Sequence, residues 1–306
     1  MIILHENIRS VKGFCRYYQK NISEQTKISR VCFNTVRKIP VLNYYIKGDT
    51  QMSTKTDLAK EIIDKKSPSY AKKRKFLFGT TEVLEFSIET AEESAFFEKP
   101  IGKYITVEAD FPKLPFGNFE NEVFAISTEL KKLIPESGNV LAVGIGNAFL
   151  TADSLGPASA ENLLCGEFFG RKLFFLVPGV FGRTGIEPEI LISSAAEKLS
   201  PSAVILIDSL AAEKVENVCR SVQLCDSGLS PGSGFSGGKP AISKKTLGVP
   251  VIAIGSPTVT AVSDSVFVSP NDIDVLVKRT AKLISAAINL SVFPEAGIDF
   301  IKGIIL

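Results

Sequence analysis

Two aspartates that follow apolar strands are the residues of this sequence best placed to do chemistry. Asp208 closes the apolar run 203–207, and Asp153 follows the strand-like run 140–147 through a short loop. In an open parallel sheet, ligands and reactive groups gather at the carboxyl ends of the strands. A carboxylate at such a place costs stability unless it is paired or used, so the two positions raise the question of a catalytic pair.

Paired carboxylates have a chemistry of their own. Two close carboxylates cannot both ionise easily, so they share one proton. The ionised member can then take a proton from water while the protonated member hydrogen-bonds a substrate carbonyl. Taken singly, Asp153 and Asp208 are explained equally well as turn formers or helix caps. A third aspartate, Asp226, follows the next predicted strand, and this repetition favours a site.

Two glycine-rich segments resemble nucleotide-binding motifs but lack residues that those motifs require. The segment 144–147 follows a strand and carries two glycines, but the third glycine of a dinucleotide-binding turn is replaced by Phe149. The glycine-rich segment 230–239 is not a phosphate-binding loop either, because Ser233 and Pro240 stand where that motif needs Gly and Ser or Thr. A tight turn and a flexible loop explain these glycines better.

Nucleophilic and metal-dependent mechanisms are disfavoured by composition. The only histidine is His5, near the amino terminus, so a Ser/His/Asp or Cys/His enzyme is close to excluded. A Ser236–Lys239 pair stays open as a minor alternative. Carboxylates without histidine favour hard cations, and no EF-hand spacing occurs. We therefore expect neither a metal nor a cofactor.

Composition indicates a soluble, intracellular protein. Of 306 residues, 45% are hydrophobic and 22% are charged, and the five cysteines follow no disulfide or metal spacing. Apolar runs such as 173–181 are broken well before the roughly 20 residues that a membrane helix needs. Residues 1–51 carry nine Lys and Arg against three Asp and Glu, whereas the rest of the chain is mildly acidic. We expect a poorly ordered basic leader, and a core that does not bind nucleic acid.

The apolar patterning predicts an α/β fold. Strands are expected at 140–147, 173–177, 203–210, 222–225 and 249–255. Their continuous apolar character is typical of a mainly parallel twisted sheet with helices on both faces. A helix is expected at 119–134. A second should begin at Thr184, which has capping-box spacing to Glu187, and run to about residue 199. A final helix should begin at Ser269-Pro270. Strands within 76–89 and 103–109 predict a small N-terminal β-containing extension. The expected divisions are a leader (1–51), an N-terminal part (52–137) and an α/β catalytic core (138–306).

Several long motifs in order resemble the germination proteases of spore-forming bacteria, over about residues 53–290. The motifs are Thr56-Asp-Leu-Ala59, Gly102-Lys-Tyr-Ile-Thr-Val-Glu108, Gly144-Ile-Gly-Asn147, Thr151-Ala-Asp-Ser-Leu-Gly-Pro157, Pro178-Gly-Val-Phe-Gly-Arg-Thr-Gly-Ile-Glu187, Ile207-Asp-Ser-Leu-Ala-Ala212, Asp226-Ser-Gly228, Pro231-Gly-Ser-Gly234 and Thr246-Leu-Gly-Val-Pro-Val-Ile-Ala-Ile-Gly255 with Pro257-Thr258. Such an ordered series is far more specific than any one motif.

The resemblance implies a fold like that of hydrogenase maturation proteases and an atypical aspartic endopeptidase that degrades small acid-soluble spore proteins during germination. It also implies a homotetrameric zymogen that processes itself near the amino terminus, in the cytoplasm of the forespore or spore core. The family's two catalytic aspartates fall on Asp153 and Asp208. The residues expected to position the substrate are Gly146, Asn147, Asp226, Gly232, Ser233 and Gly234.

The chain departs from the family pattern in three places. Ser230 replaces a histidine that members often carry, and the long insertion before the last helix is nearly absent after residue 259. The usual propeptide is short, whereas 51 residues precede Met52. We hypothesise that Met52 is the true start or that 1–51 is an atypical leader, which the mass of the natively expressed protein would decide. Two alternatives stay open: a non-catalytic scaffold or regulator on this fold, and a protease that matures another protein.

Overall fold

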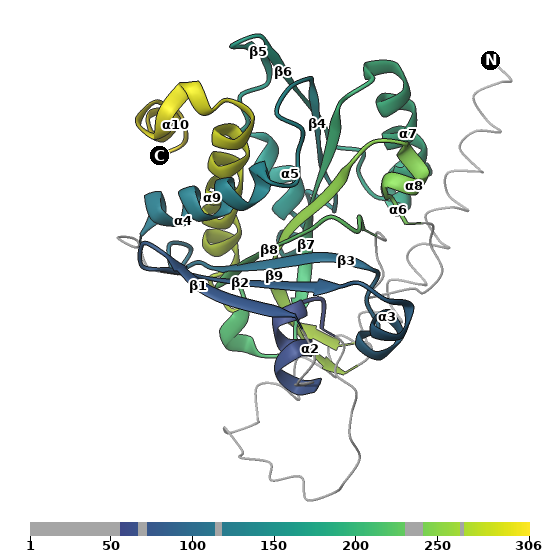
Figure 1. The fold of residues 1–306 in the computed structure, drawn as a ribbon, viewed down its shortest axis with the longest axis vertical. Coiled ribbons are helices and arrows are strands. Elements are labelled where there is room, and N and C mark those ends of the chain that lie inside the picture. The colour runs from purple at the N-terminus through teal and green to yellow at the C-terminus, as the bar shows by residue number, and fades with distance from the viewer. Residues whose placement is uncertain (1–55, 67–71, 114–117, 230–240, 264–265) are drawn as a thin grey trace, which may run out of the picture. The chain divides into compact units, whose positions relative to one another are not determined.

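The apolar runs between residues 140 and 255 form the centre of one mixed sheet. The structure, a computed structural model, describes residues 56–66, 72–113, 118–229, 241–263 and 266–306. In this part of the chain the sheet has ten strands, in the order β1-β2-β3-β8-β9-β7-β4-β6-β5, with β10 paired to β9 (Figure 1). The leader 1–51 that the sequence predicted lies outside the described residues.

The strands are β1 (Lys73–Phe78), β2 (Thr81–Ile88), β3 (Gly102–Glu108), β4 (Val140–Gly144), β5 (Gly166–Phe168), β6 (Arg171–Leu176), β7 (Ala203–Ala212), β8 (Ser221–Cys225), β9 (Val251–Ser263) and β10 (Val266–Val268). The α-helices are α2 (Ala59–Lys66), α3 (Ala91–Phe97), α4 (Phe119–Lys131), α5 (Leu155–Ala160), α6 (Phe181–Thr184), α7 (Pro188–Leu199), α8 (Lys244–Leu247), α9 (Ile273–Val292) and α10 (Gly297–Ile305). Three short 3₁₀ helices are η1 (Thr151–Asp153), η2 (Val215–Asn217) and η3 (Pro294–Ala296).

The α/β class predicted from the sequence is confirmed, in a sheet that is mixed. Strands β6, β4, β7 and β9 pair in parallel, as their apolar runs indicated. Strand β8, expected in the same series, runs antiparallel to both β9 and β3. Residues 213–220 hold only η2 and no crossover helix, so the chain reverses direction between β7 and β8. The strands β1–β3 continue the same sheet in antiparallel pairing.

Alternation along β7 assigns its side chains to two helical layers (Figure 1). Ile205 and Ile207 belong to the core cluster that includes α4 and α9. Val204 and Leu206 pack with α7 on the other face. Successive side chains of a strand point to opposite faces, so Asp208 continues the row of Val204 and Leu206 on the α7 face.

Two predicted helix starts were wrong. Helix α7 begins at Pro188, and the hydroxyl of Thr184 accepts a hydrogen bond from Ile186 N at 3.1 Å instead of capping a helix. Helix α9 begins at Ile273, and Ser269 donates to the Thr258 carbonyl at 3.0 Å. A local side-chain bond in a turn replaces capping at Thr184, and a bond to β9, eleven residues earlier in the chain, replaces it at Ser269. The helix predicted from residue 119 is confirmed as α4.

Within the described residues, no single helix is both long and apolar enough to cross a membrane. The bent pair Ile273–Val292 and Pro294–Ile305, with 103° between its parts, passes that test only when the two are joined. Most of α9 is buried in the core.

Candidate active site

Asp153 and Asp208 line one cavity of about 440 Å³ at the carboxyl ends of β4 and β7. Asp208 lies within β7, and Asp153 ends the 3₁₀ turn η1 that follows β4. Strands β4 and β7 are adjacent and parallel, with Gly144 opposite Ile207. The topology therefore brings two carboxylates that are 55 positions apart in the chain to one edge of the sheet.

Asp208 is held where a glycine of the neighbouring strand leaves room for its main chain. It pairs with Gly255 of β9, and a Cβ at Gly255 would lie 2.4 Å from the Asp208 carbonyl oxygen. The side-chain atom Oδ1 accepts a hydrogen bond from Ser209 N at 2.8 Å. Asp208 is half-buried at this position.

Asp153 is fixed by the turn that leads out of β4. Asn147 N donates to the Asp153 carbonyl oxygen at 3.0 Å and to its side-chain Oδ2 at 2.9 Å. The hydroxyl of the buried Thr258 donates to the Ala152 carbonyl, which ties η1 to β9. Gly146 has φ +118°, and a Cβ there would lie 2.1 Å from the Asp153 carbonyl oxygen. Only glycine fits at this position.

The two carboxylates differ in their affinity for a proton. Burial raises the pKa of Asp208 to about 8, and the charges of Asp153 and then Asp57 add to the rise, against the opposing effect of the Ser209 N–H. Burial also raises the pKa of Asp153, but the hydrogen bond from Asn147 N stabilises its ionised form. The raised pKa of Asp208 favours its protonated form at neutral pH.

A third carboxylate, Asp57, lines the same cavity and was not among the predicted site residues. Asp57 N donates to the Ala211 carbonyl at 2.9 Å, and Ala211 N donates to Asp57 Oδ2 at 2.9 Å. Lys99 Nζ lies 4.0 Å from Asp57 Oδ1. No strand pattern precedes Asp57, and its one signal in the sequence was its place in the motif Thr56-Asp-Leu-Ala59.

The other predicted site residues have different places. Gly146 lines the cavity, and Asn147 holds Asp153 through its main chain. Asp226 is not among the residues that line the cavity, and its Oδ1 accepts a hydrogen bond from Lys103 N at 2.7 Å. Its neighbours Cys225 and Ser227 do line the cavity, so the end of β8 lies at the site while the side chain of Asp226 bonds to β3. Gly232, Ser233 and Gly234 lie outside the described residues.

The wall of the cavity is largely apolar, with Ile145, Leu150, Phe181, Leu229 and Phe267 among its lining residues. Leu150 and Phe181 are also more than half exposed, so the apolar wall continues onto the surface. There, Arg183 stacks over the exposed ring of Phe149 at 3.7 Å. An apolar cavity with a few convergent polar groups is a typical site for a substrate. Among the described residues, no three His, Cys, Asp or Glu side chains form a group that could hold a metal ion.

Comparison with known proteins gives matches over most of the chain. A family model described as germination protease matches residues 74–291. The germination protease of Bacillus subtilis strain 168 is 34% identical over 262 residues, which are 79% of this chain and 70% of that protein. That of Priestia megaterium is 38% identical over 213 residues, and that of Clostridium perfringens strain SM101 is 35% identical over 192. The chain spans 56% of the Priestia protein and 59% of the Clostridium protein.

A search of solved structures matches the [NiFe] hydrogenase maturation protease HycI from Thermococcus kodakarensis. The match covers 52% of this chain and 97% of that chain, with 19% identity and a TM-score of 0.37.

Proposed function

The chain belongs to the germination protease family, and from this membership we propose that it is an endopeptidase that starts the degradation of small acid-soluble spore proteins during germination. The observation that carries the proposal is the shared cavity of Asp153 and Asp208, whose proton affinities differ. Pairs of titratable groups with separated pKa values are how enzymes assign an acid and a base.

The reaction follows from that difference. Protonated Asp208 donates a hydrogen bond to the oxygen of the scissile carbonyl, and ionised Asp153 takes a proton from a water molecule in the cavity. The water oxygen bonds to the carbonyl carbon, which gives a tetrahedral intermediate. Asp153 then returns its proton to the amide nitrogen as the C–N bond breaks. The products are a carboxylic acid and an amine, and no metal or covalent enzyme intermediate takes part.

The substrates are flexible spore proteins that bind DNA and become accessible once the DNA releases them. An extended chain fits an open apolar cavity better than a folded domain does. The enzyme acts in the cytoplasm of the forespore and the spore core, and its core has no role in DNA binding. As the family resemblance implies, it assembles as a homotetramer and is made as a zymogen.

Self-processing near the amino terminus is supported by the position of Asp57. Asp57 lines the cavity that Asp153 and Asp208 also line, so the chain presents part of its own amino-terminal region to the proposed catalytic groups. The expected result is a shortened chain whose new amino terminus lies near Asp57. The mass of the purified protein before and after incubation tests this.

Two experiments separate the proposal from its alternatives. After an incubation that allows self-processing, the protein should cleave a purified small acid-soluble spore protein, with chelators and thiol reagents without effect, because neither a metal nor a cysteine is used. Absence of cleavage would favour a non-catalytic scaffold. Cleavage of a different protein, with the spore proteins left intact, would favour a maturation protease.

A further inference from the structure

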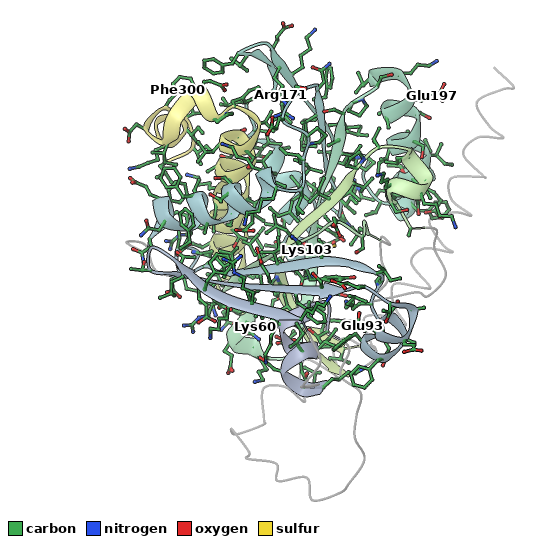
Figure 2. All side chains as sticks on the ribbon, in the orientation of Figure 1. Lys60, Glu93, Lys103, Arg171, Glu197 and Phe300 are labelled. Atoms are coloured by element: carbon green, nitrogen blue, oxygen red, sulfur yellow. The ribbon has the colours of Figure 1, made fainter. Side chains whose placement is uncertain are left out.

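The segment Thr56–Glu61 lies against the edge of β7 that β4 leaves unpaired. Strand β4 pairs with β7 as far as Ile207, whose carbonyl accepts from Ile145 N at 2.8 Å. Farther along β7, both main-chain groups of Ala211 bond to Asp57. Ala211 lies three residues beyond Asp208 in β7. Asp57 occupies the place of a strand partner there, with one bond from its main-chain N–H and one to its carboxylate. Figure 2 labels Lys60 of the same segment, at the end of the described fold opposite Arg171.

Gln223 of β8 holds the main chain of this segment. Its amide nitrogen Nε2 donates to the Asp57 carbonyl at 3.1 Å, and its Oε1 accepts from Ala59 N at 2.6 Å. The Gln223 side chain is buried and lines the same cavity as Asp208. The amide thus bonds to main-chain groups of the residues before and after Leu58. It recognises a peptide backbone and contacts no side chain of the segment through these bonds.

The carboxylate of Glu61 fills a separate pocket of hydrogen-bond donors. Glu61 Oε2 accepts from Glu213 N at 2.7 Å, and Oε1 accepts from Lys214 N at 3.1 Å and from Asn217 Nδ2 at 2.6 Å. The Thr56 hydroxyl also donates to Glu61. Converging main-chain N–H groups and an amide form a site that suits an anionic group. We call the donors from Glu213, Lys214 and Asn217 the carboxylate subsite.

Between these contacts, the side chain of Leu58 is fully buried in a small cluster with Leu210 and Ala212. The surroundings of this short stretch therefore provide a main-chain clamp on β8, an apolar contact with β7 and a carboxylate subsite in the connection between β7 and β8. Residues 56–58 lie along the strand edge and Ala59–Glu61 form the first turn of α2, so these contacts hold a peptide that is extended and then helical.

We infer that the contacts which hold Thr56–Glu61 form the binding groove for a protein substrate, with Gln223 as a main-chain clamp and Asn217 as part of a subsite for an acidic side chain of that substrate. A substrate segment takes the place of Thr56–Glu61 and presents a carboxylate to the donors that Glu61 now occupies. The inference rests on the proposed function, because it makes the groove serve the cleavage at Asp153 and Asp208.

The test is a binding measurement in which no cleavage takes part. The full chain carries Asp208→Asn to keep the probe intact, and Asp57→Ala with Glu61→Ala to weaken its own segment. The probe is a fluorescein-labelled synthetic peptide with the sequence of residues 53–64, compared with a peptide in which the residue corresponding to Glu61 is alanine. Should the triple variant not fold, Asp208→Asn with Glu61→Gln alone replaces it.

The original peptide should bind on the order of tenfold more tightly than the alanine peptide, as expected for hydrogen bonds to a charged group. Asn217→Ala should remove most of this difference. Gln223→Ala should weaken both peptides equally, since it contacts only the backbone. Asn121→Ala, whose side chain contacts Thr80 near the β1–β2 turn, is the matched control and should change neither affinity.

Three results would overturn the inference: no peptide binding, equal affinity for the two peptides, or an unchanged difference in Asn217→Ala. Lower melting temperatures of Gln223→Ala and Asn217→Ala with unchanged peptide affinity would mean that both residues only anchor α2. Peptide binding as expected in a chain that cleaves no spore protein would refute the proposed function and leave the groove standing. If the protein cleaves spore proteins but Asn217→Ala leaves the affinity difference between the two peptides unchanged, the groove is refuted and the proposed function stands.

Discussion

Gly146 and Asp153 are in contact so close that a Cβ on Gly146 would lie 2.1 Å from the Asp153 carbonyl oxygen. The glycine also has φ +118°, a conformation that L-residues rarely adopt. The turn out of β4 therefore depends on glycine to keep Asp153 at the cavity. We propose that Gly146 positions a catalytic carboxylate, and the contact with substrate suggested by the sequence stays a prediction.

Gly146→Ala should lower kcat by on the order of 100-fold, because it must push Asp153 away from the position that activates water. The change also costs stability, so kcat is measured at a temperature where circular dichroism shows the variant folded. Gly303→Ala is the control: a Cβ there meets nothing within 4 Å, and the residue lies in α10. It should leave kcat unchanged, and a wild-type kcat in Gly146→Ala would show that the contact does not position Asp153.

Thr258→Val should reduce both stability and activity, because it removes the hydroxyl that holds the Ala152 carbonyl. The lost hydrogen bond in a buried place should cost about 1–2 kcal/mol of unfolding free energy. A looser η1 should lower kcat by about tenfold. Chemical denaturation and cleavage kinetics measure the two effects.

The matched control for Thr258→Val is Thr280→Val. Thr280 is equally buried, and its hydroxyl bonds to the Leu276 carbonyl within α9, away from the cavity. This control should lose stability and keep kcat. Equal effects of the two substitutions on kcat would show that Thr258 acts through general stability alone.

The pH dependence of cleavage should be bell-shaped. Protonated Asp208 is the proposed acid, so activity should fall as pH rises through about 8, the pKa to which burial and the charge of Asp153 raise this carboxyl. Activity should also fall at low pH, where Asp153 becomes protonated. Initial rates of peptide cleavage under kcat/KM conditions measure both limbs, and a constant rate from pH 6 to pH 10 would contradict Asp208 as the acid.

Glu122 should govern a pH dependence of stability that is separate from catalysis. This buried α4 residue accepts from Asp110 N at 2.8 Å and Phe111 N at 3.1 Å, and burial raises its pKa to about 7. A carboxyl with a raised pKa in the folded state favours folding at low pH, and this contribution is lost as pH rises from its unfolded value of about 4.3 through about 7.

Glu122→Gln keeps an acceptor oxygen and removes the charge, so it should raise the melting temperature relative to wild type above pH 7 and lose this advantage near pH 4. The substitution should not change kcat. Thermal unfolding followed at both pH values checks the sign. A larger stabilisation at pH 4 than at pH 8 would contradict the raised pKa.

The parallel centre of the fold was predictable because its strands are continuous apolar runs. Residues 203–207 and 251–254 are buried on both faces, and no alternation was needed to recognise them as strands. The direction of β8 was not predictable in the same way. Ser221 and Gln223 interrupt its apolar residues, so it differs from the continuous apolar runs of the parallel strands, and its antiparallel pairing depends on β3, far away in the sequence.

The site was predictable only where its residues follow strands. Asp153 and Asp208 have that signal, and both line the cavity. Asp226 has the same signal, yet its side chain bonds to Lys103 N, although its neighbours Cys225 and Ser227 line the cavity. Asp57 and Gln223 reach the cavity through tertiary contacts between the amino-terminal segment and β7 and β8, which no local pattern encodes.

The most direct test of the proposed chemistry is the rate at which the full chain cleaves a small acid-soluble spore protein after Asp153→Asn and after Asp208→Asn. Asparagine keeps the size of each side chain but can neither take up nor release the catalytic proton. Each substitution should therefore lower kcat by at least about 10³-fold, while circular dichroism shows an unchanged fold. Asp226→Asn, at a carboxylate that does not line the cavity, should keep substantial activity. Full activity in either Asp153→Asn or Asp208→Asn would contradict hydrolysis by this pair of carboxylates.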